Sequence, residues 1–264
     1  ASQVERFNLQ DVRGDSLSRL QALKDNHCCV VDGETQDDLN HFCSQLMQAA
    51  QQGKRFLFRS AASLLTALAQ LPPQPVAAEK MREYVRDGRA GAVIVGSHVK
   101  KTTQQLSPLL QADGIQGIEI DVEKISTQRD RLLNNISANI EDCHLNNVTP
   151  VIYTSRTEIQ FDDQQSRLAF GEQVSAFLMD VVRNLPETTG FLISKGGITS
   201  NDVLSDGLAL RTSRVVGQIL AGCSVVRCPQ DHPRYPNMPV VIFPGNVGDE
   251  QALVTVYQRM KPMD

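Results

Sequence analysis

Three glycine-bearing turns are the segments of this sequence best suited to chemistry. Each follows a short apolar run and precedes a stretch that can form a helix. The turns are Gly96-Ser97, Gly196-Gly197-Ile198-Thr199 and Pro244-Gly245. Glycine lets a ligand approach the backbone closely, and free amides at a helix start attract anions. The shared pattern therefore favours phosphate contacts made by backbone N–H groups.

Each turn also has a plainer interpretation. Gly96-Ser97 alone is better explained as a tight turn with a helix cap, and an ordinary capped turn explains Gly245 equally well. The glycine pair preceded by Lys195 exceeds what a cap needs, although the lysine precedes the glycines and the pattern GxxxxGK[ST] is absent. Asp202, further along this segment, is a candidate Mg²⁺ ligand or a residue favoured by the positive end of a helix dipole.

Apolar runs alternate with helical segments, which is the pattern of a parallel sheet covered on both faces. The expected strands are 28–31, 56–58, 92–95, 118–120, 151–153, 191–193 and 240–243. Helices are expected over 39–50, 132–140 and 174–182, the first of them starting near Thr35. The fold class is α/β with mainly parallel sheets. Turns at the carboxyl ends of the strands are then expected to converge on one cleft.

The prolines within Leu71-Pro72-Pro73-Gln74-Pro75 forbid a helix and mark a connector between two domains. We expect one domain, or part of one, over residues 1–88 and a more complete α/β domain over 89–264. In the first of these, Arg59 and Ser60 follow an apolar run and precede a helix. Arg59 is a candidate clamp for a carboxylate, with a surface ion pair or a helix cap as the alternative.

Composition excludes several classes of protein. The 264 residues include 26 Lys+Arg and 30 Asp+Glu, a net charge of −4, so no basic field favours nucleic acid. No apolar run approaches the roughly 20 residues of a membrane helix, and the first residues do not form a secretory signal. Six cysteines could form a disulfide framework, but an acidic chain without a secretory signal is expected in the reducing cytoplasm. We expect most of them, Cys43 above all, to be buried, and no His or Cys spacing fits zinc.

Taken together and in this order, these segments resemble the four-carbon acid sugar kinase family. The residues that carry the resemblance are Val31-Asp32-Gly33-Glu34-Thr35, Phe58-Arg59-Ser60-Ala61-Ala62-Ser63, Val95-Gly96-Ser97, Lys195-Gly196-Gly197-Ile198-Thr199-Ser200-Asn201-Asp202 and Pro244-Gly245-Asn246-Val247-Gly248. The resemblance covers the whole chain. It implies a two-domain α/β enzyme that uses ATP and Mg²⁺ to phosphorylate erythronate, threonate or their oxo forms.

The resemblance implies that Ser97, the stretch Gly196-Gly197-Ile198-Thr199 and Gly245 contact ATP. Residues near Arg59 and Ser60 would face the sugar acid. Two departures stand out: the family pattern more often has Glu where this chain has Ile198, and its Asp-Asp-x-Thr-Gly motif is absent. The chain also does not begin with Met. We therefore expect the rear part of a sugar-acid-binding domain followed by a whole nucleotide-binding domain.

An ATP-dependent sugar-acid kinase is the leading hypothesis. A nucleotide-binding module without catalysis, lacking the acceptor half, is the second. A dinucleotide oxidoreductase is remote because no GxGxxG follows any expected strand. The expected partner is a small sugar acid, with neither nucleic acid nor membrane, and a homo-oligomer is left open.

Overall fold

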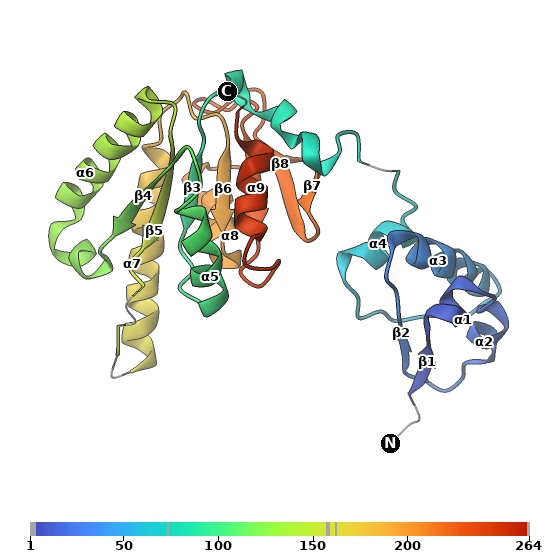
Figure 1. The fold of residues 1–264 in the computed structure, drawn as a ribbon. Coiled ribbons are helices and arrows are strands. Elements are labelled where there is room, and N and C mark those ends of the chain that lie inside the picture. The colour runs from blue at the N-terminus through green and yellow to red at the C-terminus, as the bar shows by residue number, and fades with distance from the viewer. Residues whose placement is uncertain (1–3, 73, 157–158, 162, 263–264) are drawn as a thin grey trace. The chain divides into compact units, whose positions relative to one another are not determined.

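The computed structural model describes residues 4–72, 74–156, 159–161 and 163–262. It contains two compact units, residues 1–73 and 74–264 (Figure 1). Pro73, within the expected connector, lies outside the described residues. Among the described residues, no helix combines the length and the apolar character that a membrane crossing requires.

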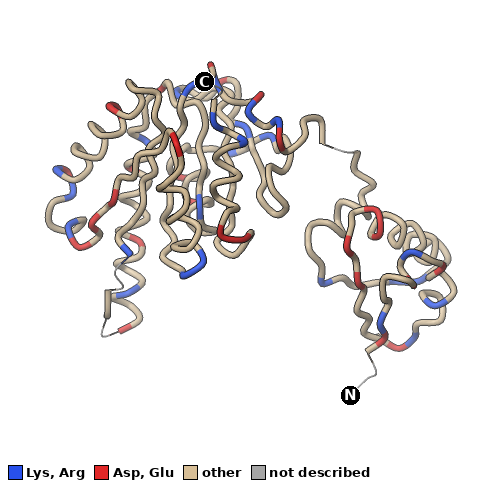
Figure 2. Tube along the Cα trace, in the orientation of Figure 1, with Lys and Arg blue, Asp and Glu red and all other residues tan. Residues whose placement is uncertain are grey.

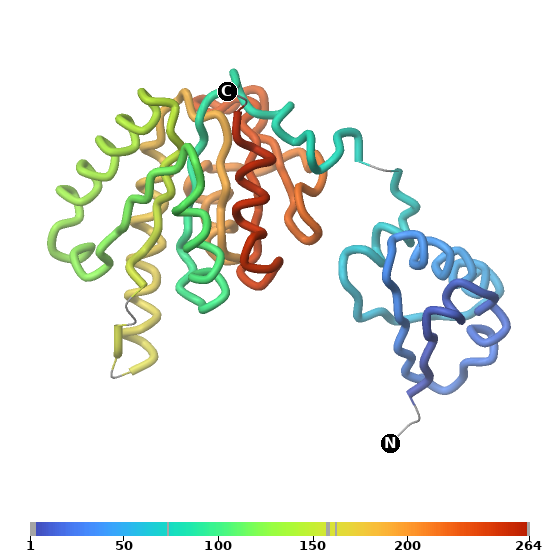
Figure 3. Tube along the Cα trace, in the orientation of Figure 1, coloured from blue at the N-terminus to red at the C-terminus, as the bar shows by residue number. Residues whose placement is uncertain are grey.

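The second unit begins earlier than the expected boundary near residue 88, because residues 74–88 pack on it. The Gln74 side chain donates to the carbonyl oxygen of Gln218 at 3.0 Å, and Met81 is fully buried in the second unit's core. Figure 3 shows this stretch running along the second unit. These contacts assign residues 74–88 to the second unit.

The first unit is a small α/β layer. Its elements are β1 (Glu5–Phe7), α1 (Leu9–Arg13), α2 (Leu17–Ala22), β2 (Cys29–Val31), α3 (Gln36–Gln51) and α4 (Ala62–Leu68). β1 and β2 pair in parallel, and Phe7 packs edge-on against Phe42 of α3. The predicted start of α3 is confirmed, since Thr35 is its N-cap and forms a reciprocal capping box with Asp38.

The strand predicted at 56–58 is wrong. These residues form an irregular segment between α3 and α4, and the Leu57 side chain is 100% exposed. An apolar run becomes a strand only where a neighbouring strand satisfies its backbone and a core receives its side chains. Within the described part of the chain, no strand pairs with this run.

The second unit begins with the 3-10 segments η1 (Ala78–Tyr84) and η2 (Arg86–Gly88) and is built on a seven-stranded sheet of order β4-β5-β3-β6-β9-β8-β7. The first five of these strands run parallel, whereas β8 is antiparallel to both β9 and β7. The strands are β3 (Ala92–Val95), β4 (Ile115–Ile120), β5 (Thr149–Thr154), β6 (Leu192–Lys195), β7 (Arg214–Leu220), β8 (Cys223–Arg227) and β9 (Pro239–Phe243). The predicted α/β class and mostly parallel sheet are confirmed.

Helices cover both faces of this sheet (Figure 1). They are α5 (Lys100–Leu109), α6 (Ile125–Leu145), α7 (Gln164–Arg183), α8 (Gly197–Asp202) and α9 (Ala252–Met260), with short turns η3 (Val122–Lys124) and η4 (Val203–Gly207). Apolar residues of α5 and α9 fill one core, and those of α6 and α7 fill the other. β3 explains the two cores: Ala92 and Ile94 face the α6–α7 core, whereas Val93 and Val95 face the α5–α9 core.

All six cysteines are free thiols. Cys43, Cys143, Cys223 and Cys228 are buried, Cys29 is half-buried and Cys28 is exposed. The expectation that most of them serve as small buried apolar residues therefore agrees with the structure.

Candidate nucleotide-binding site

Three neighbouring parallel strands end at the same level of the sheet. Val95 of β3 is in register with Lys195 of β6, which is in register with Phe243 of β9. The glycine-bearing turns that follow these strands therefore leave the sheet side by side. The structure thus brings the predicted turns together at one edge.

The direction in which the chain adds strands to the sheet reverses between β3 and β6. The chain leaves β3 through α5 toward β4 and β5, and it leaves β6 through α8 toward β7, β8 and β9, on the opposite side. The connections after β3 and β6 thus run in opposite directions along the sheet. Ligands of open α/β sheets bind at such a switch point.

The first two turns pack against each other. A Cβ atom on Gly96 would lie 2.5 Å from Thr199 Oγ1, and one on Gly196 would lie 3.2 Å from Ser97 Cβ. Gly196 also has a φ of +124°, in the region that favours glycine. Thr102 Oγ1 donates to Ser97 Oγ at 3.3 Å, which orients that hydroxyl beside the glycine pair. Gly96 and Gly196 are therefore required by the fold itself.

Gly197 and Gly245 differ from these two glycines. A Cβ atom at either position would meet no atom within 4 Å, and neither residue has a positive φ. The chain gives no packing reason for glycine at these two positions, and the space in front of both backbones is open. This is the geometry that lets a phosphate reach the main chain, so the residues present fit a nucleotide.

The start of α8 offers amide donors to that space. In the described part of the chain, no hydrogen bond engages the N–H groups of Gly197 and Ile198. The Ile198 side chain is 80% exposed, whereas Thr199 and Ser200 are turned inward and buried. Ile198 therefore offers its backbone N–H to the open space, while its apolar side chain is exposed to solvent. Thr199 acts by packing under Gly96.

Lys195 does not reach the ligand space. Its side chain is fully buried, and its Nζ donates to the carbonyl oxygens of Pro244 at 2.7 Å and Gly245 at 3.2 Å. Burial lowers the pKa of this lysine to about 8. The interpretation of Lys195 as part of the phosphate cradle is therefore corrected: the alternation of side chains along β6 places it under the third turn, which it supports.

Asp202 is not brought to the turns. It is the last residue of α8, about 8 Å along the helix from the glycine pair, and not a residue of the first turn. The hydroxyl of Ser175, in α7, donates to its Oδ2 atom, so this carboxylate oxygen already has a hydrogen-bond partner. Across the described residues, no group of three or more His, Cys, Asp or Glu side chains is arranged to hold a metal ion.

Arg59 and Ser60 lie in the first unit, on the irregular segment before α4. Ala61, and not Ser60, occupies the N-cap position of α4, and it provides no side-chain bond. Both predicted residues are exposed. No hydrogen bond or ion pair within the described residues engages the Arg59 guanidinium, which therefore faces solvent with all its donors available.

Arg156 is a residue that sequence reasoning missed. Its guanidinium, half-buried beyond β5, donates to the carbonyl oxygen of Ser97 at 2.7 Å and to Thr154 Oγ1 at 3.2 Å. It thereby fixes the turn after β3 from the side opposite to α8. No local motif marks this residue, because its partner in the turn is far away in the sequence.

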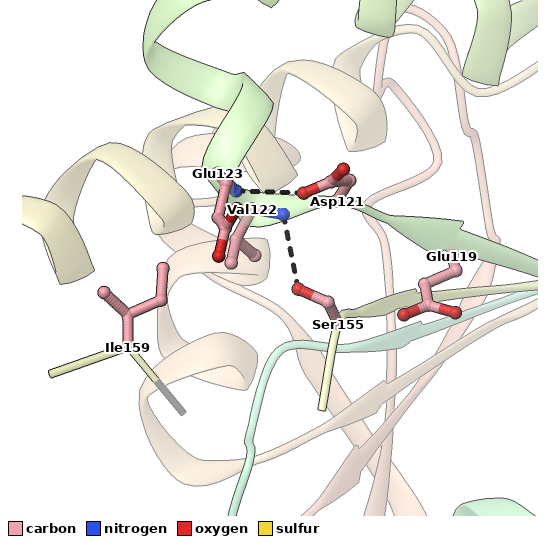
Figure 4. A pocket seen from close by; sticks show the side chains of 6 residues that line it. All are labelled: Glu119, Asp121, Val122, Glu123, Ser155 and Ile159. Atoms are coloured by element: carbon pink, nitrogen blue, oxygen red, sulfur yellow. Dashed lines mark hydrogen bonds between the residues drawn. The ribbon is translucent and has the colours of Figure 1, made fainter. Parts of the chain in front are cut away.

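A cavity of about 430 Å³ lies beside the ends of β4 and β5. Figure 4 shows its carboxylates, Glu119, Asp121 and Glu123, and the bond of 3.3 Å that Ser155 Oγ accepts from the Val122 N–H. Negative charge of this density opposes a polyphosphate. This cavity is therefore poorly suited to phosphates. Elsewhere, acidic and basic residues are interspersed over each unit (Figure 2).

Two models of protein families match this chain. One, described as a sugar-binding N-terminal domain, matches residues 1–68, and the other, described as a nucleotide-binding C-terminal domain, matches residues 92–253. The chain belongs to the four-carbon acid sugar kinase family. The glycine turns of the second unit all lie within the match to the family's nucleotide-binding domain.

Solved structures show a similar fold. A protein of Salmonella typhimurium LT2, provisionally described as a tRNA synthase, has a TM-score of 0.58 at 17% identity over 97% of this chain and 59% of its own. A Bordetella bronchiseptica protein described as a domain of unknown function (DUF1537), solved as a domain-swapped dimer with bound citrate, has a TM-score of 0.53 at 17% identity over 98% of this chain and 59% of its own. This chain thus spans 59% of the length of both. No protein with a curated description matches it.

Proposed function

We propose that this chain carries the nucleotide site of an ATP-dependent kinase that phosphorylates a four-carbon sugar acid such as erythronate, threonate or an oxo-tetronate. The observation that carries the proposal is the open space in front of Gly197 and Gly245. Both glycines lie on turns that leave adjacent parallel strands at the same level. The family's sugar-binding and nucleotide-binding domains support the two substrates.

The turns would donate hydrogen bonds to the phosphates of the nucleotide. ATP supplies the phosphoryl group in this class of reaction, and a hydroxyl oxygen of the acid receives it. The N–H groups of Gly197 and Ile198, with Ser97 beside them, would bind phosphate oxygens and hold the donor in place. Gly245 is the other proposed backbone contact, whereas Gly196 and Thr199 are proposed to act by shaping the turns.

Mg²⁺ is proposed as a partner of the nucleotide. It is bound in most phosphoryl-transfer sites by substrate phosphates together with one or two carboxylates. The carboxylate of Asp202 already accepts the Ser175 hydroxyl, so the present arrangement gives Asp202 no support as that ligand. The phosphates themselves are the proposed main ligands.

Arg59 is the proposed contact for the carboxylate of the acid, with Ser60 beside it. An exposed guanidinium with all its donors available can bind a carboxylate through two parallel hydrogen bonds. The citrate described for the Bordetella bronchiseptica protein supports a carboxylate-bearing ligand in this fold. The domain swap described there supports a homo-oligomer for this chain as well.

A kinase assay tests the proposal. The chain is incubated with ATP, Mg²⁺ and each of D- and L-erythronate, D- and L-threonate and the oxo-tetronates, and the products are followed by phosphorus NMR. We expect a phosphate monoester and ADP with at least one of these acids. ADP formation independent of every acid would contradict the proposal.

A nucleotide-binding module without catalysis is the second candidate. The observation in its favour is that the described residues of the first unit form a sheet of two strands. ATP binding without phosphorylation of any acid in the same panel would select this candidate.

A further inference from the structure

Side chains from α5 and β6 bind every backbone carbonyl of the turn from Pro244 to Asp249, here called the braced turn. Lys195 Nζ donates to the oxygens of Pro244 (2.7 Å) and Gly245 (3.2 Å). Lys101 Nζ donates to those of Asn246 (3.2 Å) and Gly248 (3.1 Å). Gln105 Nε2 donates to those of Val247 (2.9 Å) and Asp249 (2.7 Å). A loop held by side chains at each successive carbonyl has little freedom to rearrange.

The direction of the carbonyls fixes the direction of the amides. In a trans peptide the C=O of one residue and the N–H of the next point in opposite directions, and the described chain contains no cis peptide. The N–H groups of residues 245–250 therefore point away from the three bracing side chains. For Asn246, Val247 and Gly248, the described residues provide no acceptor for these N–H groups.

Two lysine ammonium groups bind the carbonyls of the braced turn, whose own carboxylate, Asp249, lies at its end. Lys195 is fully buried, and neither it nor Lys101 forms an ion pair with a carboxylate among the described residues. Two ammonium groups thus lie behind a row of outward amides. Lys195 is a buried charge, and buried charges in proteins are normally compensated; an anion in front of the turn would compensate it.

Gln105 holds the braced turn at the cost of an unpaired side-chain oxygen. Its side chain is fully buried, and its Oε1 atom has no hydrogen-bond partner among the described residues. An unpaired buried acceptor is costly, and an apolar residue would avoid that cost. The amide is explained by its two donors, which hold the carbonyls of Val247 and Asp249.

We propose that Lys101, Gln105 and Lys195 are positioning residues that hold the braced turn with its amides toward the phosphates of the nucleotide. This inference rests on the proposed function, because the anion it assigns to the turn is a nucleotide polyphosphate. None of the three residues is assigned a contact with the substrate. They act through the backbone of the turn.

Lys101→Met tests the inference, with Lys100→Met as the matched control. Both lysines are exposed on the first turn of α5, but within the described residues Lys100 makes no hydrogen bond or ion pair. In the nucleotide-free chain, we expect the NMR order parameters of residues 245–250 to fall from about 0.85 toward 0.6 in Lys101→Met only. Gln105→Met is the second variant, for which the same loss of order is expected.

Binding provides the second readout. We expect roughly tenfold weaker calorimetric affinity for ATP and ADP in Lys101→Met, less than twofold weakening in Lys100→Met, and unchanged affinity for adenosine, which lacks phosphates. Equal losses in the two lysine variants, an equal loss for adenosine, or unchanged order parameters in Lys101→Met would overturn the inference. A wild-type chain that binds no nucleotide would instead contradict the proposed function, while the order parameters would still decide whether the lysine holds the turn.

Discussion

The Oγ1 atom of Thr199 lies 2.5 Å from the position that a Cβ atom would take on Gly96. The turn after β3 is thus packed directly against the start of α8. Glycine at position 96 is what allows the first two turns of the proposed phosphate site to lie side by side.

Gly96→Ala is expected to destabilise the chain by roughly 1–3 kcal/mol, because the added methyl group overpacks against Thr199 and Leu178. Denaturant unfolding measures this loss. In a Thr199→Ala background, the same change should cost less, since two of the three close atoms are removed. An equal cost in both backgrounds would show that the contact is not the cause.

Lys195 should make stability depend on pH in the alkaline range. Burial lowers its pKa from 10.5 to about 8, so between these values the folded chain has lost a proton that the unfolded chain still holds. The free energy of unfolding therefore gains up to about 1.4 kcal/mol per pH unit from this group as pH rises.

The comparison of wild type with Lys195→Met isolates this effect, because the buried thiols and Tyr235 are common to both proteins. Denaturant unfolding at pH 7, 8, 9 and 10 should show the stability of wild type rising relative to the variant above pH 8. A constant difference over this range would mean that the lysine titrates normally.

Asp38 should make the first unit sensitive to acid. The Arg13 guanidinium at 2.8 Å and the Thr35 N–H at 2.9 Å hold the pKa of this carboxyl well below 3.8. Its contribution to stability is present above pH 4 and is lost as pH falls through the lowered value. Asp38→Asn should therefore melt earlier than wild type at pH 7, and calorimetry should show the gap closing toward pH 2.

Arg59→Gln is expected to raise the KM for the sugar acid tenfold or more and to leave ATP affinity unchanged, because a bidentate bond to the carboxylate is lost. Arg55→Gln is the matched control, since Arg55 is also exposed on the same irregular segment. Steady-state kinetics with the best acid measures both. An equal effect of the two changes would assign the loss to general charge and not to a clamp.

The central strands could be predicted because they are buried on both faces. All four residues of β3 are fully buried, and such a run shows in the sequence as uninterrupted apolar residues. The edge strand β7 carries no such signal. In β7, polar and apolar residues mix, and Gly217, with a φ of +148°, interrupts the alternation at a register shift.

The site could be predicted only in part, for a similar reason. Glycines mark the turns by residue type alone, whereas the residues that hold the turns are identified only by their partners. Lys101 lies 145 positions from Asn246, whose carbonyl it binds. Neither spacing nor composition reports a contact of that kind. The position of Lys195 before the glycines suggests a phosphate contact, but the side chain is buried under the third turn.

Titration of ATP with Mg²⁺ by calorimetry tests the central claim most directly, on wild type, Gly197→Val and Gly171→Ala. A Cβ atom at Gly197 or at Gly171 would meet nothing within 4 Å, but only Gly197 lies at the proposed phosphate site, whereas Gly171 is exposed within α7. We predict that Gly197→Val loses at least tenfold in ATP affinity with its fold intact, and that Gly171→Ala binds as wild type while gaining about 1 kcal/mol of stability. ATP binding by Gly197→Val as tight as that of wild type would contradict the account.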